Sequence, residues 1–402
     1  MRVAVVGCGT AGPVAALLLA RDGHDVSMVE RVAEPRAVGA GILLQRLGQE
    51  ILGSLGLAED LRRRSTPVLW VDARTRDGRR VMDFRYDDVV ARSHGWGVHR
   101  GVLFELLWDA VSAAGIPIET GVRIDGLRSS ASGWWLRTSS SGERGPFDLV
   151  IGADGARSRL RRLSGLASKD VGYPYGALWA VVDDPDGLAG DALFQGYGDT
   201  RITLGVLPTG IGKASIFWSI RSREMARTVA AGTAAWAEVA RSYAGDLAPL
   251  IDRVPEGDLL AARYRDVVVR SPVLARAHGA LVLLGDAAHA MSPQLGLGAS
   301  LALADAWTLA ACLRARPMDL SLALRDYDRA RRAQIRYYRW CSRLMTPVFQ
   351  SDVVPLGWAR DLLAHPVARV PWVRRQFVTT LMGVRTSPWT TWAAPPGPPD
   401  HR

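Results

Sequence analysis

The amino-acid sequence predicts an α/β fold in which a parallel, nucleotide-binding sheet is interrupted by a mostly antiparallel sheet and followed by C-terminal helices. Three observations predict this fold. A β-branched run at residues 3–6 leads directly into a glycine-rich loop and an Ala/Leu-rich segment. Two further apolar runs, at residues 148–153 and 281–284, end in Asp-Gly and Gly-Asp turns. The segments between them contain alternating β-rich stretches, which are typical of an antiparallel sheet.

Length and composition narrow the class of protein. The 402 residues suit two or three domains. With 48% hydrophobic and 22% charged residues, the chain has an ordinary globular composition, which excludes disorder, collagen and coiled coil. No apolar stretch is long enough for a membrane span. The three cysteines, Cys8, Cys312 and Cys341, show no CxxC or Cys/His spacing, so we expect neither a metal site nor a disulfide scaffold.

The charge and the N-terminus each suggest a function that we do not expect. The net charge is +10, and all cations except Lys169 and Lys213 are arginines. Because these arginines are scattered among leucines and acids, they indicate a solvated basic surface that helps to attract an anionic cofactor, and no nucleic-acid partner. Residues 1–20 imitate a secretory signal, but glycines interrupt the apolar run. We expect the segment to be retained and the protein to be cytoplasmic.

The first 30 residues follow the order strand, glycine loop, helix, strand, acid. The loop reads Gly7-Cys8-Gly9-Thr10-Ala11-Gly12, and the acid is Glu30. In this Rossmann-like arrangement the first glycine permits a tight turn, the second lets the backbone approach a pyrophosphate, and the third lets the helix pack closely on the strand. The free N–H groups of the helix attract phosphate, and Glu30 can accept from ribose hydroxyls. The pattern predicts a dinucleotide site and leaves NAD and FAD open. Cys8 fills a variable position of the loop rather than acting as a nucleophile.

Two later strand-to-turn junctions add polar groups to this site. One ends in Asp154-Gly155, and the other continues through Gly285-Asp286 to a glycine-rich segment that contains Gly298. Asp286 can accept from sugar-like hydroxyls, and the glycines can bring backbone amides against a flat ligand. His289 is interpreted as a structural histidine with its hydrogen bonds satisfied.

With these three motifs in this order, the chain resembles the FAD-dependent aromatic hydroxylases, the single-component flavoprotein monooxygenases that include para-hydroxybenzoate and salicylate hydroxylases. Residues 39–42 and the pair His99-Arg100 also match family positions, and the resemblance spans residues 1–335. It implies bound FAD, with NAD(P)H as a transient reductant. It also implies that O₂ hydroxylates an aromatic or other electron-rich hydrophobic small molecule through a flavin C4a-hydroperoxide.

The resemblance also implies roles for individual residues. Glu30 would bind the ribose, Arg100 the ribityl or phosphate region, and Asp286 a ribityl hydroxyl. The backbone of Gly298 and Ala299 would face the flavin pyrimidine. The complete set assigned to the cofactor is Gly7, Gly9, Ala11, Gly12, Glu30, Arg31, Gly41, Arg100, Asp154, Gly285, Asp286, Gly298 and Ala299.

The resemblance also places Pro293 beside the flavin ring system, near the site of the oxygen reaction. The family commonly has glutamine at Leu297 and asparagine at Ser300, so side-chain hydrogen bonds at these positions are not expected here. No catalytic acid or base is assigned. The three residues considered for deprotonating a phenol are His94, His99 and Tyr197.

The domain organisation is predicted to be discontinuous. The FAD-binding domain comprises residues 1–70, 98–170 and 270–335, and the substrate domain comprises 71–97 and 171–269. A helical region, 336–392, and a disordered tail, 393–402, follow. Helical composition is expected at 224–243, 319–350 and 372–382. The candidates for lining the substrate chamber are Trp179, Phe194, Tyr197, Phe217 and Trp218, with ordinary sheet core as the alternative for each.

Other functions of the same fold stay open. They are epoxidation or other oxidative tailoring of a natural product, isoprenoid reduction, and a non-catalytic nucleotide- or drug-binding protein. Trp134-Trp135 does not fit the WxWxIP motif of flavin-dependent halogenases. No second strand–GxGxxG–helix unit is found, which agrees with transient binding of the nicotinamide nucleotide.

Overall fold

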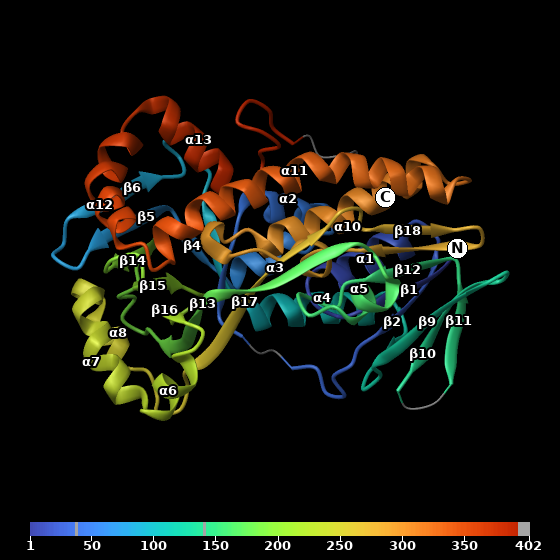
Figure 1. Ribbon diagram of the computed structural model, residues 1–402, viewed down its shortest axis with the longest axis horizontal. Coiled ribbons are helices and arrows are strands. Elements are labelled where there is room, and N and C mark those ends of the chain that lie inside the picture. Colours follow the sequence, from blue (N-terminus) through green and yellow to red (C-terminus); the bar gives the residue numbers. More distant parts are fainter. Residues whose placement is uncertain (37–38, 140–141, 393–402) are drawn as a thin grey trace.

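The computed structural model describes residues 1–36, 39–139 and 142–392 (Figure 1). The tail expected at 393–402 lies outside these residues. The molecule is elongated, with a parallel sheet and its helices towards one end and a larger antiparallel sheet towards the other. This arrangement confirms the predicted fold class, an α/β protein with a second, mostly antiparallel sheet and C-terminal helices.

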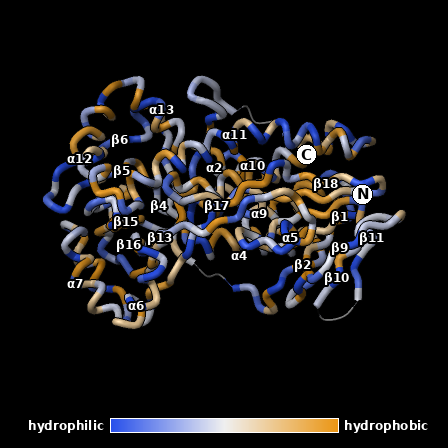
Figure 2. The backbone as a smooth tube through the Cα atoms, viewed as in Figure 1, coloured by the Kyte–Doolittle hydropathy of each residue, from blue (hydrophilic) through white to orange (hydrophobic). Residues whose placement is uncertain are grey.

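The first sheet has six strands in the order β18-β19-β12-β1-β2-β8. All neighbours are parallel except β18 and β19. Its core is apolar on both faces, because β1, β12 and β19 are continuous Val/Ile/Leu/Ala runs, as buried parallel strands require (Figure 2). The strands are β1 (Arg2–Val6), β2 (Asp25–Val29), β8 (Ile118–Glu119), β12 (Leu149–Gly152), β18 (Val273–Arg276) and β19 (Gly279–Leu283).

Helices cover one face of this sheet and a small meander covers the other. On the helical face α1 packs against α10, and α10 packs against α11. On the opposite face Trp134 and Leu136 pack with Ala4 and Val150. The short helices α5 (Arg159–Ser164) and α9 (Asp286–His289) pack in the same cluster as the meander. The other helices of this half are α1 (Ala11–Arg21), α2 (Arg46–Ser54), α3 (Ala58–Arg63), α4 (Arg100–Ala113), α10 (Gly298–Ala315) and α11 (Leu320–Phe349); the meander is β9 (Ile124–Ser130), β10 (Gly133–Thr138) and β11 (Glu143–Phe147).

The second large sheet has seven strands in the order β17-β13-β16-β15-β14-β5-β6. It is antiparallel except where β14 runs parallel to β5. Helices α6 (Met225–Ala230), α7 (Thr233–Ala244) and α8 (Ala248–Asp252) gather at its outer side (Figure 1). Its strands are β5 (Trp70–Thr75), β6 (Arg80–Arg85), β13 (Ser168–Asp183), β14 (Ala192–Tyr197), β15 (Thr203–Pro208), β16 (Lys213–Arg221) and β17 (Leu260–Val269).

A three-stranded sheet joins the two halves. It consists of β3 (Gly41–Leu44), β7 (Gly95–His99) and β4 (Thr66–Val68). Two glycines let it lie against the seven-stranded sheet: a Cβ on Gly97 would be 1.8 Å from the Pro208 carbonyl oxygen, and one on Gly41 would be 2.4 Å from Thr209 Oγ1. Any side chain at either position would push the two sheets apart.

The C-terminal region packs back on both halves. The helix expected at 319–350 is α11, which is continuous through residue 335, so the division expected there falls inside one helix. The helix expected at 372–382 is α13 (Pro371–Leu381). Between them lies α12 (Val354–Ala368), which falls inside the helical region expected at 336–392; its bounds were not predicted from the sequence, because two prolines interrupt its pattern. No helix of the described chain has both the length and the apolar character needed to cross a bilayer.

Candidate functional site

The three sequence motifs meet at the carboxyl ends of β1, β12 and β19. A Cβ on Gly7 would lie 2.5 Å from the carbonyl oxygen of Ala153, so the first loop touches the residue before Asp154. A Cβ on Gly285 would lie 3.7 Å from Cβ of Ala11, so the third motif touches the start of α1. Strand ends in an open parallel sheet are the usual place for a bound nucleotide.

The first loop presents unpaired backbone donors. Helix α1 begins at Ala11, and the preceding Thr10 makes no side-chain hydrogen bond to the helix end. A Cβ on Gly12 would lie 2.0 Å from the Gly7 carbonyl oxygen, so only glycine permits this turn. Gly9, in contrast, is exposed and has open space around it. The uncapped N–H groups and the helix dipole therefore face a free volume that suits an anionic group.

Glu30 is held at the edge of this loop. Its carboxylate accepts hydrogen bonds from the backbone N–H of Cys8 at 2.9 Å and of Val32 at 3.0 Å. The neighbouring Arg31 is exposed. Burial, with a smaller contribution from the Glu30 charge, raises the pKa of the Cys8 thiol to about 12. The cysteine therefore stays a protonated thiol, in agreement with the prediction that it is not a nucleophile.

Asp154 has one satisfied and one unsatisfied oxygen. Oδ2 accepts from the backbone N–H of Arg159 at 2.7 Å and of Leu160 at 3.0 Å, which caps the short helix α5. Oδ1 is buried, and the described residues offer it no hydrogen-bond partner. The capping role was not anticipated from the sequence, and the second oxygen stays available for a ligand group.

Asp286 is accessible to solvent, yet enough protein surrounds it that burial raises the pKa of its carboxyl group. A group that is both exposed and surrounded lines a recess open to solvent, and we call this recess the hollow. His289 and Arg100 oppose this rise with their charges, so Arg100 lies within electrostatic reach. Arg100 is the first residue of α4, and its side chain packs beside Gly39. Arg100 and Asp286, which are far apart in the sequence and were both assigned to the cofactor, therefore lie near each other in the fold.

A buried ionic network supports the Gly285-Asp286 turn from behind. Asp305, fully buried on α10, accepts from the Gly285 N–H at 2.7 Å. The same carboxylate contacts His289 Nε2 at 2.6 Å and Arg331 Nε at 2.7 Å. His289 therefore has the structural role predicted for it. The sequence reading missed Asp305 and Arg331, because each lies in a long helical run with no motif around it.

The pKa of Asp305 reflects these contacts. Burial alone would raise it, but His289, Arg331 and the Gly285 hydrogen bond outweigh burial and lower it to about 2. Arg331 also hydrogen-bonds Gln334, whose amide nitrogen donates to the Gly383 carbonyl at 2.8 Å. The network therefore links the turn to α10, α11 and the segment after α13.

The start of α10 presents a second set of free backbone donors. Gly298 is exposed with open space around it, and Leu297 provides no side-chain cap. The Ser300 hydroxyl is buried without a partner among the described residues. Pro293 is also exposed, on the turn that precedes the helix. These groups fit a planar ligand whose polar edge meets the helix N-terminus.

The seven-stranded sheet faces this turn across the hollow. Gln294 Nε2 donates to Gln350 Oε1 at 2.8 Å, and Gln350 Nε2 donates to Ser219 Oγ at 3.1 Å. At the other end of β16, Gly41 N–H donates to Ser215 Oγ at 2.9 Å. Phe217 lies midway between the two serines on the same face of the strand, so its ring faces the space between the two sheets.

Phe217 belongs to an aromatic group of three. Its ring lies over Gly205, where a Cβ would come within 1.8 Å, and its centroid is 5.2 Å from that of Trp179. Trp179 lies close enough to the Tyr264 hydroxyl on β17 to oppose the rise of its pKa. Trp179, Phe217 and Tyr264 are all partly exposed. Tyr264 was not among the residues considered from the sequence.

Three of the expected lining residues do not line this space. Phe194 and Trp218 point to the other face of the sheet, into the cluster with α7 that contains Trp236. Trp218 directly follows Phe217, and Phe194 is in register through Val206 with Ile216, which directly precedes Phe217. Because successive side chains of a strand point to opposite faces, both point away from the face that carries Phe217. Tyr197 is on the correct face but is buried under Arg360, whose guanidinium lies 4.3 Å from its ring centroid.

None of the three residues considered as a base is placed to act as one. His99 Nδ1 accepts from the Gly101 N–H at 3.2 Å and caps α4. His94 Nε2 accepts from Trp96 Nε1 at 3.3 Å. Burial raises the pKa of the Tyr197 hydroxyl, which donates to Gln195 Oε1 at 2.7 Å. No group of His, Cys, Asp and Glu in the described ranges could hold a metal ion.

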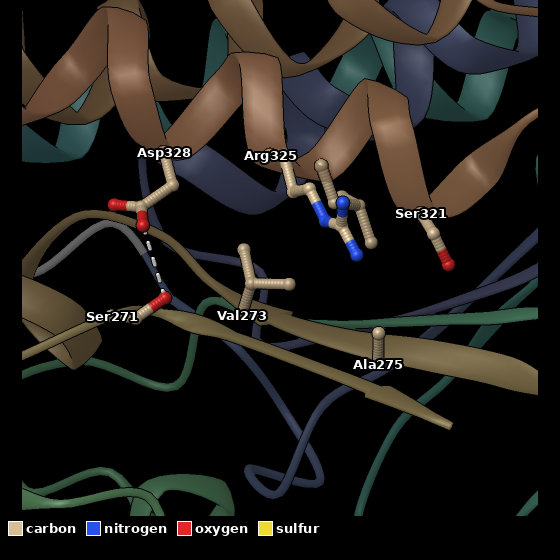
Figure 3. Close-up of a pocket in the computed structure, with 7 residues that line it drawn as sticks. Ser271, Val273, Ala275, Ser321, Arg325 and Asp328 are labelled. Atoms are coloured by element: carbon tan, nitrogen blue, oxygen red, sulfur yellow. Dashed lines mark hydrogen bonds between the residues drawn. The ribbon is translucent and has the colours of Figure 1, made fainter.

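A separate surface hollow of about 220 Å³ lies between α11 and β18 (Figure 3). Ser271 Oγ donates to Asp328 Oδ2 at 3.1 Å across its end, and Val273 and Arg325 extend into it. It contains none of the residues of the three motifs, and it is open to solvent.

Comparisons with known proteins bear on the site. A family model described as FAD binding domain matches residues 1–336. The chain is 29% identical over 357 residues to 6-hydroxynicotinate 3-monooxygenase of Pseudomonas fluorescens, covering 83% of this chain and 88% of the relative. It is 30% identical over 357 residues to 3-amino-4-hydroxybenzoate 2-monooxygenase of Streptomyces cremeus, covering 82% and 83%. The structure of Klebsiella pneumoniae HpxO complexed with FAD and uric acid is similar, with a TM-score of 0.80, 21% identity and coverage of 95% and 97%.

Removing the Asp286 carboxylate should weaken binding of the nucleotide. In Asp286→Ala a polar partner in the hollow is lost, so we expect the dissociation constant for FAD to rise about tenfold or more. Fluorescence titration of the deflavinated protein with FAD measures this. Asp109→Ala, which removes an exposed carboxylate on α4, is the matched control. Unchanged affinity of the Asp286 variant would refute the assignment.

The Asp305 network should make the protein acid-sensitive in a defined window. Because the folded pKa is depressed, its stabilisation is complete above about pH 4, the pKa of an unfolded aspartate. It is lost as the pH falls towards about 2. We expect Asp305→Asn to melt at a lower temperature than the wild type at neutral pH. We also expect its melting temperature to change less than that of the wild type between about pH 4 and about pH 2. Circular dichroism melts across pH measure both.

The control for this series is Asp22→Asn. Asp22 follows α1, and its Oδ1 is 3.0 Å from Nε of Arg314. Arg314 lies in the last turn of α10, the helix that also carries Asp305. This variant should keep the wild-type dependence on acid. If Asp305→Asn also followed the wild-type profile, the network would not be the group that titrates.

Proposed function

This chain belongs to the FAD-dependent aromatic hydroxylase family, and from that premise we propose that it uses NAD(P)H and O₂ to hydroxylate an uncharged aromatic or other electron-rich hydrophobic small molecule. It is an FAD-dependent flavoprotein monooxygenase.

One observation carries the proposal. The hollow is bounded on one side by polar backbone groups and two carboxylates, and on the other by an aromatic face. The first side fits FAD, with Gly9 and α1 at the pyrophosphate, Glu30 at the ribose, Asp286 and Arg100 at the ribityl chain, and Gly298 at the pyrimidine. The second side leaves room for a flat apolar substrate against Trp179 and Phe217.

FAD, when bound, supplies the two-electron chemistry by which NAD(P)H and O₂ are used for oxygenation. The chain contributes electrostatics and exclusion of water. The free N–H groups at the start of α10 and its helix dipole stabilise negative charge on a group held there. The Trp179 and Phe217 rings cover the opposite side and keep water away from the reacting atoms.

The aromatic face favours an uncharged substrate. The middle of the sheet face that carries Phe217 is uncharged, and the charged Asp183, Lys213 and Arg221 lie on that face only at the strand ends; the uncharged residues are Ala177, Trp179, Val181, Thr203, Leu207, Ser215, Phe217 and Ser219. A carboxylate placed against them would lose its hydration without gaining an ionic partner from these strands. The relatives named above act on hydroxylated or amino-substituted rings, which supports an electron-rich aromatic substrate; the rings in their names also carry a carboxylate, and this chain is proposed to differ from them in that group.

Tyr264 is proposed to orient the substrate. Burial raises the pKa of its hydroxyl, so the group stays protonated at neutral pH. Trp179 lies beside this hydroxyl and, as an N–H donor, opposes the rise of its pKa, so the Tyr264 O–H is proposed to donate to the substrate. A hydroxyl or carbonyl oxygen of the substrate is the acceptor that this arrangement suits.

The test of the function is a substrate screen of the yellow holoenzyme. Uncharged phenols and hydroxyquinolines should stimulate oxidation of NADH or NADPH, and the product should contain one oxygen atom from ¹⁸O₂. Their carboxylated counterparts serve as the matched comparison. Reduced-nucleotide oxidation that never transfers an oxygen atom to any tested compound would overturn the proposal.

Tyr264→Phe tests the orienting hydroxyl. With a substrate found in the screen, we expect kcat/KM to fall about tenfold, the equivalent of one hydrogen bond, while FAD binding is unchanged. Steady-state kinetics and FAD titration measure the two effects. Tyr243→Phe, on α7 behind the sheet, is the control. Equal kinetics for Tyr264→Phe and wild type would exclude Tyr264 from the substrate site.

A further inference from the structure

Helix α12 presents a continuous apolar face to solvent. Its outward residues recur at spacings of three and four, the period of one helix face, and they are all apolar. We call this set the α12 face: Val353, Pro355, Trp358, Ala359, Leu362, Leu363, Pro366, Val367 and Val370. Trp358 is 67% exposed and Leu362 is 65% exposed. A soluble helix normally turns such a stripe towards the core.

The helix is anchored in this orientation by its opposite side. Arg360 is buried there and donates to the carbonyl oxygens of Gly198 at 3.0 Å and Val348 at 3.2 Å. Its neighbour Asp361 pairs with it at 2.7 Å. Gly357 packs against the backbone of Thr200. The two charged residues of the helix thus point inward, so rotating α12 to bury its apolar face would expose this polar side and break its contacts.

The surroundings of the face are basic and rich in tryptophan. Arg369 and Arg375 are exposed, and no ion pair links either of them to another residue of the described ranges. Trp372 and Trp389 are 54% and 77% exposed, and their ring centroids are 6.0 Å apart. Tryptophan and arginine beside an apolar helix face are typical of helices that lie in a membrane–water interface.

We propose that the α12 face binds the surface of a membrane that contains anionic lipids. The helix would lie in the plane of the interface, with Trp358, Leu362 and Leu363 among the lipid headgroups and acyl chains. Arg369 and Arg375 would meet the lipid phosphates. At 15 residues α12 is too short to cross a bilayer, which agrees with an in-plane position.

Charge favours a membrane over a second copy of the chain. In a symmetric dimer the same patch meets itself, which would bring Arg369 and Arg375 of both copies to one contact between two chains of net charge +10. An anionic lipid surface is complementary to the same groups. α12 lies at the end of the molecule remote from the six-stranded sheet and packs on β6 (Figure 1), so contact there leaves the nucleotide loops free.

The test is co-sedimentation of the holoenzyme with vesicles. Wild-type protein should bind vesicles of phosphatidylcholine with phosphatidylglycerol more strongly than vesicles of phosphatidylcholine alone. The double variant Leu362→Glu/Leu363→Glu should lower the partition coefficient on the anionic vesicles by about tenfold or more, because two leucines that the proposal buries in the membrane are lost. Val229→Glu/Val239→Glu, which places the same charges at exposed valines of α6 and α7, should bind as the wild type does.

A second measurement does not depend on the folding of the double variant. Brominated phosphatidylcholine mixed with phosphatidylglycerol should quench part of the wild-type tryptophan fluorescence, and Trp358→Phe should remove a share of that quenching. Absence of binding to anionic vesicles, binding unaffected by the leucine substitutions, or quenching unaffected by Trp358→Phe would each overturn the proposal. So would a wild-type dimer that becomes monomeric in the leucine variant and that binds no vesicles.

Discussion

The buried carboxylate of Asp305 is the contact on which the arrangement of the site depends. It holds the Gly285 N–H, His289 and Arg331 at once, so the turn that carries Asp286 is fixed to α10 and α11 rather than to its own loop. A buried charge of this kind is stable only while its partners remain. The position of Asp286 in the hollow therefore depends on helices far along the chain.

Two glycines fix the distance between the three-stranded sheet and the seven-stranded sheet. Gly41 and Gly97 let the small sheet touch the seven-stranded sheet, and Gly41 also donates to Ser215. At the other end of β16, Ser219 is linked through Gln350 to Gln294, on the turn that carries Pro293. The cofactor side and the substrate side are thus joined by backbone and side-chain contacts, which tolerate little displacement.

The sequence predicted the family, the fold class and the meeting of three motifs, because each motif is a local backbone requirement that glycine and aspartate reveal. It did not reveal Asp305 or Arg331, since a single charge in an apolar helix has no local signature. For the lining of the chamber, composition supplied only candidates. Trp179 and Phe217 share one face of the sheet and stay candidates, whereas Phe194 and Trp218 face α7, because composition identifies a strand but register decides which face each side chain occupies.

The two longest strands of the molecule, β13 with 16 residues and β17 with 10, run side by side along the boundary between its halves. Their shared ladder lies within the seven-stranded sheet, so this sheet could not bend sharply between β13 and β17 without breaking a row of backbone hydrogen bonds. The wall that carries Trp179 and Phe217 is therefore stiff, and its freedom to move lies in side chains and in the turns at the strand ends.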